Sequence, residues 1–151
     1  MSDRSEAVDA WEALYRAQVA VLRQLRAEFP DGGTSFIEYD VLFNLSRQQN
    51  HALRIRDLNK HLLLTQPSVS RLLDRLAARG LVTKDNDPDD ARGTVVTLTA
   101  AGLDEFRRVG ALHSRSIAQK MSALTAEELR QLTALTDKLR AGGPPSSPGR
   151  R

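Results

Sequence analysis

Cysteine is absent from the 151 residues of this chain. Disulfide bonds, thiolate catalysis and redox sensing through cysteine are therefore excluded. No stretch approaches the ~20 apolar residues that a transmembrane helix needs. The N-terminal residues MSDRSEAVDA also lack the apolar segment of a signal peptide. We therefore expect a cytoplasmic protein without membrane contact.

The sequence is equally poor in patterns that indicate catalysis. It has no glycine-rich phosphate loop, no His and Cys cluster at metal-ligand spacing and no nucleophile motif. Its three histidines, His51, His61 and His113, are badly spaced for a structural metal site. We predict that the chain is not an enzyme and holds neither a cofactor nor a metal. A regulatory metal bound by His113 and acidic groups stays open as an alternative.

The charge balance is only modestly basic. The formal net charge is +3 and the isoelectric point is about 9.7. Between residues 54 and 92, aspartates offset most of the lysines and arginines, but the helix predicted after Thr65 has three arginines and one aspartate. DNA binding would therefore rest on directed contacts more than on bulk charge.

Residues 65–98 are predicted to form a helix followed by a β-hairpin. Thr65 can cap the helix with its hydroxyl, Pro67 fits the first turn, and Gly80 suits the left-handed backbone at the end. Spacings of three and four residues place one apolar face toward a core, formed by Val69, Leu72, Leu73 and Leu76. The arginines fall mostly on the other faces.

Two short runs after this helix, 81–83 and 94–98, can pair as a hairpin, and the charged loop 85–93 between them carries Arg92. The helix fits the major groove of DNA, and the hairpin can place an arginine in the minor groove. An ordinary α+β domain with solvated arginines explains charge and periodicity equally well. Residues 55–64 favour DNA binding, because a short helix there completes a helix-turn-helix.

A resemblance to a known family is carried by the run IRDLNKHLLLTQPSVSRLLDRLAARGLVTKDNDPDDARGTVVTLTAAG. This run is similar to the winged helix-turn-helix of the MarR family of bacterial transcriptional regulators. Its most specific segments are SRLLDRLAARGLV, the wing DPDDARG and the closing VTLTAAG, and the similarity covers about residues 8–140. Asn59 departs from the family pattern, in which many members have alanine. The resemblance implies a mainly α fold with a small β-hairpin wing, in which long dimerisation helices flank the winged helix-turn-helix.

This interpretation divides the chain into four parts. Residues 1–33 form the N-terminal helix of the dimerisation region, 34–98 the winged helix-turn-helix domain, 99–140 the C-terminal dimerisation helices, and 141–151 a disordered tail rich in Gly, Pro and Ser. Amphipathic stripes suit dimerisation, although packing within one chain explains them too. The resemblance favours a homodimer through the first and last helices. Two-fold symmetry would then require DNA half-sites about 10–10.5 bp apart.

The first turns of the helix after Thr65 supply most candidate DNA contacts. In this motif they reach base edges, and Gln and Arg can pair bidentately with adenine and guanine. The predicted DNA-binding residues of this helix are Gln66, Ser68, Val69, Ser70, Arg71 and Arg75. Arg75 and Ser70 are assigned to phosphate, and Val69 either to a thymine methyl group or to the core.

The wing supplies the second group of candidates. Arg92 matches the wing arginine of the family pattern and is predicted to enter the minor groove, where a narrow groove concentrates negative potential. Asp90 is expected to orient Arg92 by bonding its guanidinium. Arg54 and Lys84 are weaker candidates for phosphate contacts. The alternative for the aspartates around the wing is a solvated loop.

Many MarR relatives release DNA when a small aromatic or anionic effector binds between the dimerisation helices and the reading domain. The residues that could line such a cleft here are Trp11, Tyr15, Tyr39 and His113. Each also suits an ordinary core or interface position, although His113 is polar on an otherwise apolar stripe.

The sequence therefore predicts a sequence-specific DNA-binding transcriptional regulator. We expect a homodimeric repressor that binds a pseudo-palindromic promoter site and is released by a small-molecule effector. Its partners would be double-stranded DNA, a second copy of the chain and the effector. Two alternatives stay open: a winged-helix module that binds proteins, in which Arg71 and Arg92 would be dispensable, and a non-specific DNA binder.

Overall fold

The computed structural model describes the backbone of residues 2–62 and 66–142, and the side chains of residues 3–62 and 68–142. The cap predicted at Thr65 lies outside the described residues, as does most of the predicted tail. None of the described helices combines the length and the apolar character that crossing a membrane requires.

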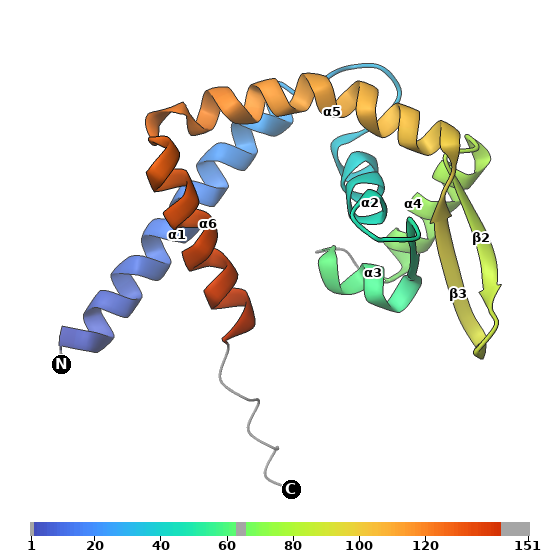
Figure 1. Ribbon diagram of the computed structural model, residues 1–151, viewed down its shortest axis with the longest axis horizontal. Helices are drawn as coiled ribbons and strands as arrows, with labels where there is room; N and C mark the ends of the chain where they lie inside the picture. The colour runs from blue at the N-terminus through green and yellow to red at the C-terminus, as the bar shows by residue number, and fades with distance from the viewer. Residues whose placement is uncertain (1, 63–65, 143–151) are drawn as a thin grey trace, which may run out of the picture. The chain divides into compact units, whose positions relative to one another are not determined.

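Contacts divide the chain into two compact units, the first ending at Ser116 and the second beginning at Ile117. The first unit opens with a long helix, α1 (Ser2–Ala27), which is blue in Figure 1. Leu25 near its end is buried, whereas Val8, Trp11 and Tyr15 are 53%, 59% and 50% exposed. Within the described chain, α1 therefore carries an apolar face that is open to solvent.

Short helices and three strands make up the middle of the first unit. In chain order they are α2 (Phe36–Ser46), β1 (Ala52–Arg54), α3 (Ile55–His61), α4 (Gln66–Ala78), β2 (Val82–Asp87) and β3 (Asp90–Leu98). β3 is the central strand and pairs antiparallel with both β1 and β2. Figure 1 shows β2 and β3 side by side. The hairpin of β2 and β3 is called the wing below. A helical fold with a small β-hairpin confirms the predicted fold class.

The core of this unit is built from the apolar face of α4. Leu72 is 2% exposed, and Val69, Leu73 and Leu76 are fully buried, as their spacing predicted. They pack with residues of α2, α3 and the sheet, namely Val41, Leu42, Leu45, Leu58, Leu62, Leu81, Val82, Val96 and Leu98. Burying one such side chain stabilises the fold by about 1.5–3 kcal/mol. The core therefore holds α4 by one face and leaves its opposite face to solvent.

A tight joint connects the end of α4, the wing and the next helix, α5 (Ala100–Lys120). Gly80 has φ +73°, a left-handed conformation that glycine adopts without strain. The Thr99 hydroxyl donates to the Gly80 carbonyl at 2.7 Å and accepts from the Gly102 N–H at 3.0 Å, so Thr99 caps the start of α5. A Cβ on Gly102 would lie 2.0 Å from the Leu81 carbonyl oxygen, so only glycine fits there.

The second unit contains the end of α5, a short 3₁₀ turn (Met121–Ala123) and α6 (Ala126–Ala141). Thr125 and Glu128 form a capping box, in which the Thr125 N–H donates to the Glu128 carboxylate at 2.7 Å. Leu135 and Leu139 are 61% and 65% exposed on α6. This helix also has an apolar stripe without cover among the described residues. It extends into the start of the predicted tail, because Ala141 is still helical.

Candidate nucleic-acid interface

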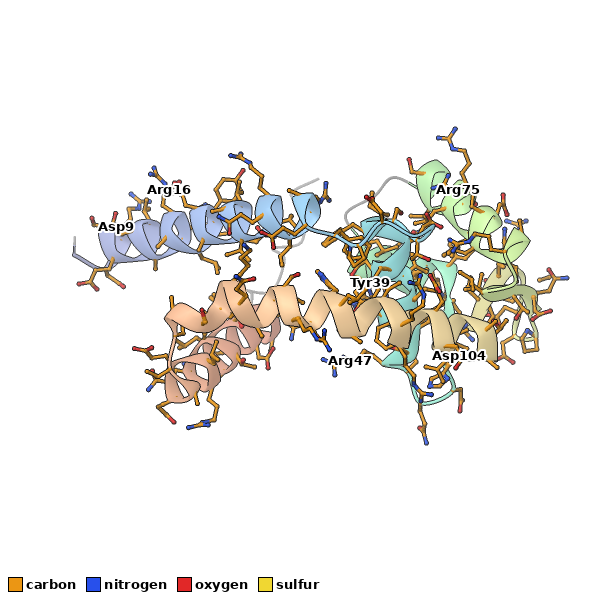
Figure 2. All side chains as sticks on the ribbon, turned by 90° about the horizontal axis from the view of Figure 1, so that it is seen from above. Asp9, Arg16, Tyr39, Arg47, Arg75 and Asp104 are labelled. Carbon is orange, nitrogen blue, oxygen red and sulfur yellow. The ribbon has the colours of Figure 1, made fainter. Side chains whose placement is uncertain are left out.

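The solvent face of α4 carries a group of polar side chains. Ser70, Arg71 and Arg75 are exposed, and Ser68 is half-buried. Arg75 is labelled on this helix in Figure 2. In the described part of the chain, no carboxylate pairs with the guanidinium of Arg71 or Arg75. Two cations on one face of a helix are therefore available to a ligand with negative charge.

Val69 does not belong to this face. Its side chain is fully buried in the core, so a contact with a thymine methyl group would require α4 to leave its packing. The prediction of a DNA contact is wrong for this residue, and its alternative assignment to the core is confirmed. Gln66 is the first residue of α4, but its side chain lies outside the described residues.

Lys84 on β2 is tied to α4. Its Nζ lies 2.6 Å from the Asp74 carboxylate of α4, and the Lys84 side chain is 29% exposed. The lysine therefore joins the wing to α4 and offsets the only acidic charge on that helix. This pairing competes with the phosphate contact that the sequence suggested for Lys84.

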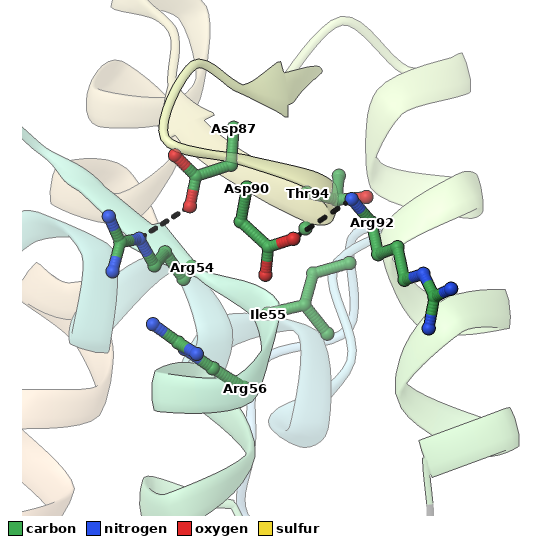
Figure 3. A pocket seen from close by; sticks show the side chains of 8 residues that line it. Arg54, Ile55, Arg56, Asp87, Asp90, Arg92 and Thr94 are labelled. Carbon is green, nitrogen blue, oxygen red and sulfur yellow. Dashed lines mark hydrogen bonds and ion pairs between the residues drawn. The ribbon is translucent and has the colours of Figure 1, made fainter.

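The turn of the wing places Arg92 on the surface. The Arg92 N–H donates to the Asp90 carboxylate at 3.0 Å. The expected bond from Asp90 to the Arg92 guanidinium is thus wrong: the carboxylate holds the backbone of the turn, and the guanidinium points away from both aspartates (Figure 3). The short side chain of Asp90 reaches the backbone two residues on, as aspartate often does in turns.

The turn end of the wing is fixed by a partly buried ion pair. The Arg54 Nε lies 2.6 Å from the carboxylate of Asp87, which is only 5% exposed (Figure 3). Asp87 also accepts the Asp89 N–H at 3.0 Å. Removing Arg54 would leave a buried carboxylate without its cation. Arg54 therefore braces the wing, which differs from the phosphate contact predicted for it.

Arg56, at the start of α3, is a candidate that the sequence analysis missed. It is exposed and lines the same pocket as Arg92, together with Gly93 and Thr94. This pocket has a volume of about 240 Å³ and lies between α3 and the wing (Figure 3). The sequence indicated Arg56 only by its place in the first helix of the helix-turn-helix, which crosses the DNA backbone in that motif.

An aromatic cluster lies where α2 meets α5. The His113 ring is 5.2 Å from the rings of both Phe29 and Tyr39 and 5.7 Å from Phe36, and Tyr39 stacks on Phe106 at 5.5 Å. Tyr39 lies between the two helices (Figure 2). His113 is 5% exposed, its Nδ1 has no partner in the described structure, and burial lowers its pKa.

The structure brings together only two of the four predicted effector residues. Tyr39 and His113 share the aromatic cluster, and burial, with a smaller effect of Asp40, raises the pKa of Tyr39. Trp11 and Tyr15 stand one turn apart on α1, with rings 5.7 Å from each other, and both are at least half exposed. Their described ring contact is with each other.

A hollow of about 300 Å³ lies beside this cluster. Its lining includes Arg26, whose guanidinium sits 5.2 Å from the centre of the Phe36 ring, and also Asp40 and His61. Burial raises the pKa of Asp40, and the nearby His61 opposes that shift. Within the described residues, no group of three or more potential metal ligands is found.

This architecture and its sequence match known proteins. The chain matches the family model described as MarR family over residues 33–93. A MarR family transcriptional regulator from Streptomyces coelicolor, solved in complex with DNA, is 26% identical, with a TM-score of 0.77 over 97% of this chain and 93% of that one. This chain belongs to the MarR family. In MarR terms, α3 and α4 are the helix-turn-helix and the β2–β3 hairpin is the wing.

Two further transcriptional regulators are similar. The PcaV transcriptional regulator of Streptomyces coelicolor, solved with its natural ligand, is 26% identical, with a TM-score of 0.65 over 86% of this chain and 89% of that one. The transcriptional repressor MprA of Escherichia coli strain K12 is 30% identical over 66% of this chain. The chain spans 56% to 66% of the length of three curated regulators that it matches, MprA among them.

Proposed function

We propose that this MarR family chain is a sequence-specific DNA-binding transcriptional regulator. The observation that carries the proposal is the pairing of two surfaces: α4 offers unpaired arginines on its solvent face, and the wing offers Arg92. Arg71, in the first turns of α4, reads a base edge in the major groove, and Arg75 contacts phosphate. Arg92 enters the minor groove. The S. coelicolor relative solved with DNA supports this assignment.

A homodimer is the form in which the chain acts. Support comes from exposed apolar side chains on helices of both units, such as Trp11 at 59% and Leu139 at 65%. Apolar stripes of this kind are usually covered by a partner. Two-fold symmetry then makes the binding site a pseudo-palindrome, and occupation of a promoter represses it. MprA, named a transcriptional repressor, is consistent with that direction of control.

A small aromatic or anionic molecule releases the dimer from DNA. The supporting observations are the aromatic cluster around Tyr39 and His113 and the neighbouring hollow with Arg26. PcaV was solved with its natural ligand, which agrees with a ligand-responsive regulator. Trp11 and Tyr15 would join such a site only through rearrangement or a second copy.

Selection from a pool of random duplexes at fixed salt tests the proposal. We expect enrichment of an inverted repeat with half-sites about 10–10.5 bp apart. Binding without enrichment would instead indicate a non-specific DNA binder. No binding would favour a winged-helix module that binds proteins.

Substitution of the two arginines on α4 then tests their separate roles. Arg71→Ala should lower discrimination between the selected and a shuffled duplex by ~1–3 kcal/mol. Arg75→Ala, the matched control on the same helix, should weaken both duplexes alike and reduce the salt dependence. Measured dissociation constants on both duplexes decide this, and an equal loss on both for Arg71→Ala would contradict base reading.

A further inference from the structure

The C-terminal end of α4 is held by a polar network that the DNA-binding surface does not include. Arg79 follows the last helical turn, and its backbone N–H still donates to the Arg75 carbonyl at 3.2 Å. Its guanidinium donates to the Glu38 carboxylate of α2 at 3.0 Å and to the Thr34 hydroxyl at 2.9 Å. One side chain thus joins α4 to the segment that begins α2.

The network continues into α5. The Thr34 hydroxyl donates to the Glu105 carboxylate at 2.6 Å, and Arg79 itself lies 3.9 Å from that carboxylate. Arg108 holds Glu105 with two bonds, of 3.0 Å and 2.7 Å. Thr34 is 4% and Glu38 8% exposed, so these groups are largely shielded from water. The chain of bonds therefore runs from α4 through Thr34 to α5.

A small change at this end of α4 would move the DNA-contacting end of the helix by a much larger distance. α4 has 13 residues, and at 1.5 Å per residue it is about 20 Å long. A tilt of about 5° at its C-terminal end would move its first turn by about 1.7 Å, which is far more than a hydrogen bond tolerates. The apolar face of α4 packs against a core of side chains, whereas the network fixes one end to two other helices.

We propose that Arg79 is a positioning residue for DNA recognition, which sets the tilt of α4 by joining its end to α2 through Glu38 and to α5 through Thr34 and Glu105. The inference rests on the proposed function, since it concerns the accuracy of DNA reading. Arg79 contacts no base in this account. Its action reaches DNA only through the placement of Arg71 and the other residues of the first turns.

Four variants test the proposal. Arg79→Met keeps the length of the side chain and removes its donors, and Glu105→Gln weakens the far end of the network. The double variant tests whether both act through one path. Arg107→Met is the matched control, because Arg107 is exposed on the same helix as Glu105 and its loss removes the same charge. Affinities for the selected inverted repeat and a shuffled duplex are measured at several salt concentrations.

Arg79→Met should lower the ratio of specific to non-specific affinity about tenfold. Affinity for the shuffled duplex and its salt dependence should match those of the wild type. Glu105→Gln should lower the ratio in the same direction, the double variant should be no worse than Arg79→Met, and Arg107→Met should leave the ratio unchanged. Equal losses on both duplexes with a shallower salt dependence would mean that Arg79 binds phosphate, and would overturn the proposal. A lower Tm with an unchanged ratio would also overturn it.

Hydrogen exchange on the DNA-free protein separates this proposal from the proposed function. Amides of residues 68–78 should exchange faster in Arg79→Met and Glu105→Gln than in the wild type and Arg107→Met. A wild-type chain that selects no sequence would contradict the proposed function, while exchange would still report whether the network holds α4. Equal exchange in all four proteins would refute the attachment whatever the DNA result.

Discussion

α4 and the outer part of the wing are held in place by different forces. α4 is anchored by a row of fully or almost fully buried apolar side chains. Val82, Val96 and Leu98 anchor the base of the wing in the same core, but the outer part of the wing is held by ion pairs, from Arg54 to Asp87 beside the turn and from Lys84 to Asp74 at the side. Buried apolar surface has no charge that dissolved ions can screen or a proton can neutralise, whereas ion pairs are weakened in both ways. The two parts of the candidate interface should therefore fail under different conditions.

The largest effect is expected from the core under α4. Leu73→Ala would leave a cavity at a fully buried position and should lower the free energy of unfolding by about 2–5 kcal/mol. Urea denaturation measures this change. Ser70→Ala, one turn earlier on the exposed face, is the control and should change stability little. A small loss for Leu73→Ala would show that α4 is not held mainly by burial.

A smaller loss is expected from the ion pair beside the turn of the wing. Arg54→Met should destabilise the protein by about 1–3 kcal/mol, because it leaves the buried Asp87 carboxylate without its partner. Adding Asp87→Asn to this variant should recover part of the loss, since the unpaired charge is then gone. Hydrogen exchange should be faster in β2 and β3 than in α4. Uniform acceleration across both regions would contradict a separate anchor for the wing.

Acid should loosen the polar attachment of α4 before the core fails. The Arg108 hydrogen bonds, helped by Thr34, lower the pKa of Glu105 to about 2 from 4.5. The unfolded chain takes up this proton first as pH falls. The stability that Glu105 contributes is therefore complete above about pH 4.5 and is lost as pH falls toward 2.

Thermal unfolding of wild type and Glu105→Gln between pH 2 and 7 measures this contribution. The difference in stability between them should shrink across that acidic window. Burial lowers the pKa of His113 from 6.5, so the fold also loses stability as pH falls below 6.5. This loss occurs in both proteins and therefore drops out of the difference between them. A constant difference at all pH values would show that Glu105 acts without its charge.

The smallest effect is expected at the exposed pair between the wing and α4. Lys84→Met should cost only ~0.2–1 kcal/mol, because the Asp74 side chain is 65% exposed. Salt should remove most of that difference. Denaturation at low and high salt checks this, with Lys60→Met as a control, since Lys60 forms an exposed pair within α3. A salt-independent loss would indicate that the Lys84 stem packs rather than pairs.

Local patterns predicted the parts of the fold that depend on near neighbours in sequence. The buried face of α4, the Thr99 cap and the capping box of Thr125 follow from spacings of three and four residues, which a helix turns into contacts. The exposure of Arg71 follows from the same periodicity. The helices and the position of the wing could therefore be predicted from the sequence alone.

Ion pairs between residues far apart in the sequence could not be predicted in this way. Arg54 meets Asp87 because β1 and β2 flank the same central strand, and Lys84 meets Asp74 because β2 passes beside α4. Both cations were read as free phosphate ligands. Arg56 was missed, and the bond of Asp90 was assigned to the wrong atom of Arg92. Charges in a sequence show their number, but their partners depend on how the sheet brings strands together.

The acidic residues around the wing also bear on how quickly the protein can search DNA. Asp85, Asp89 and Asp90 are exposed near Arg92, and the whole chain carries a formal net charge of only +3. Long-range attraction to the phosphate backbone is correspondingly weak, so encounters with random duplex should be short-lived. We therefore expect the protein to spend little time sliding on unrelated sequence and to search DNA mainly by dissociating and rebinding.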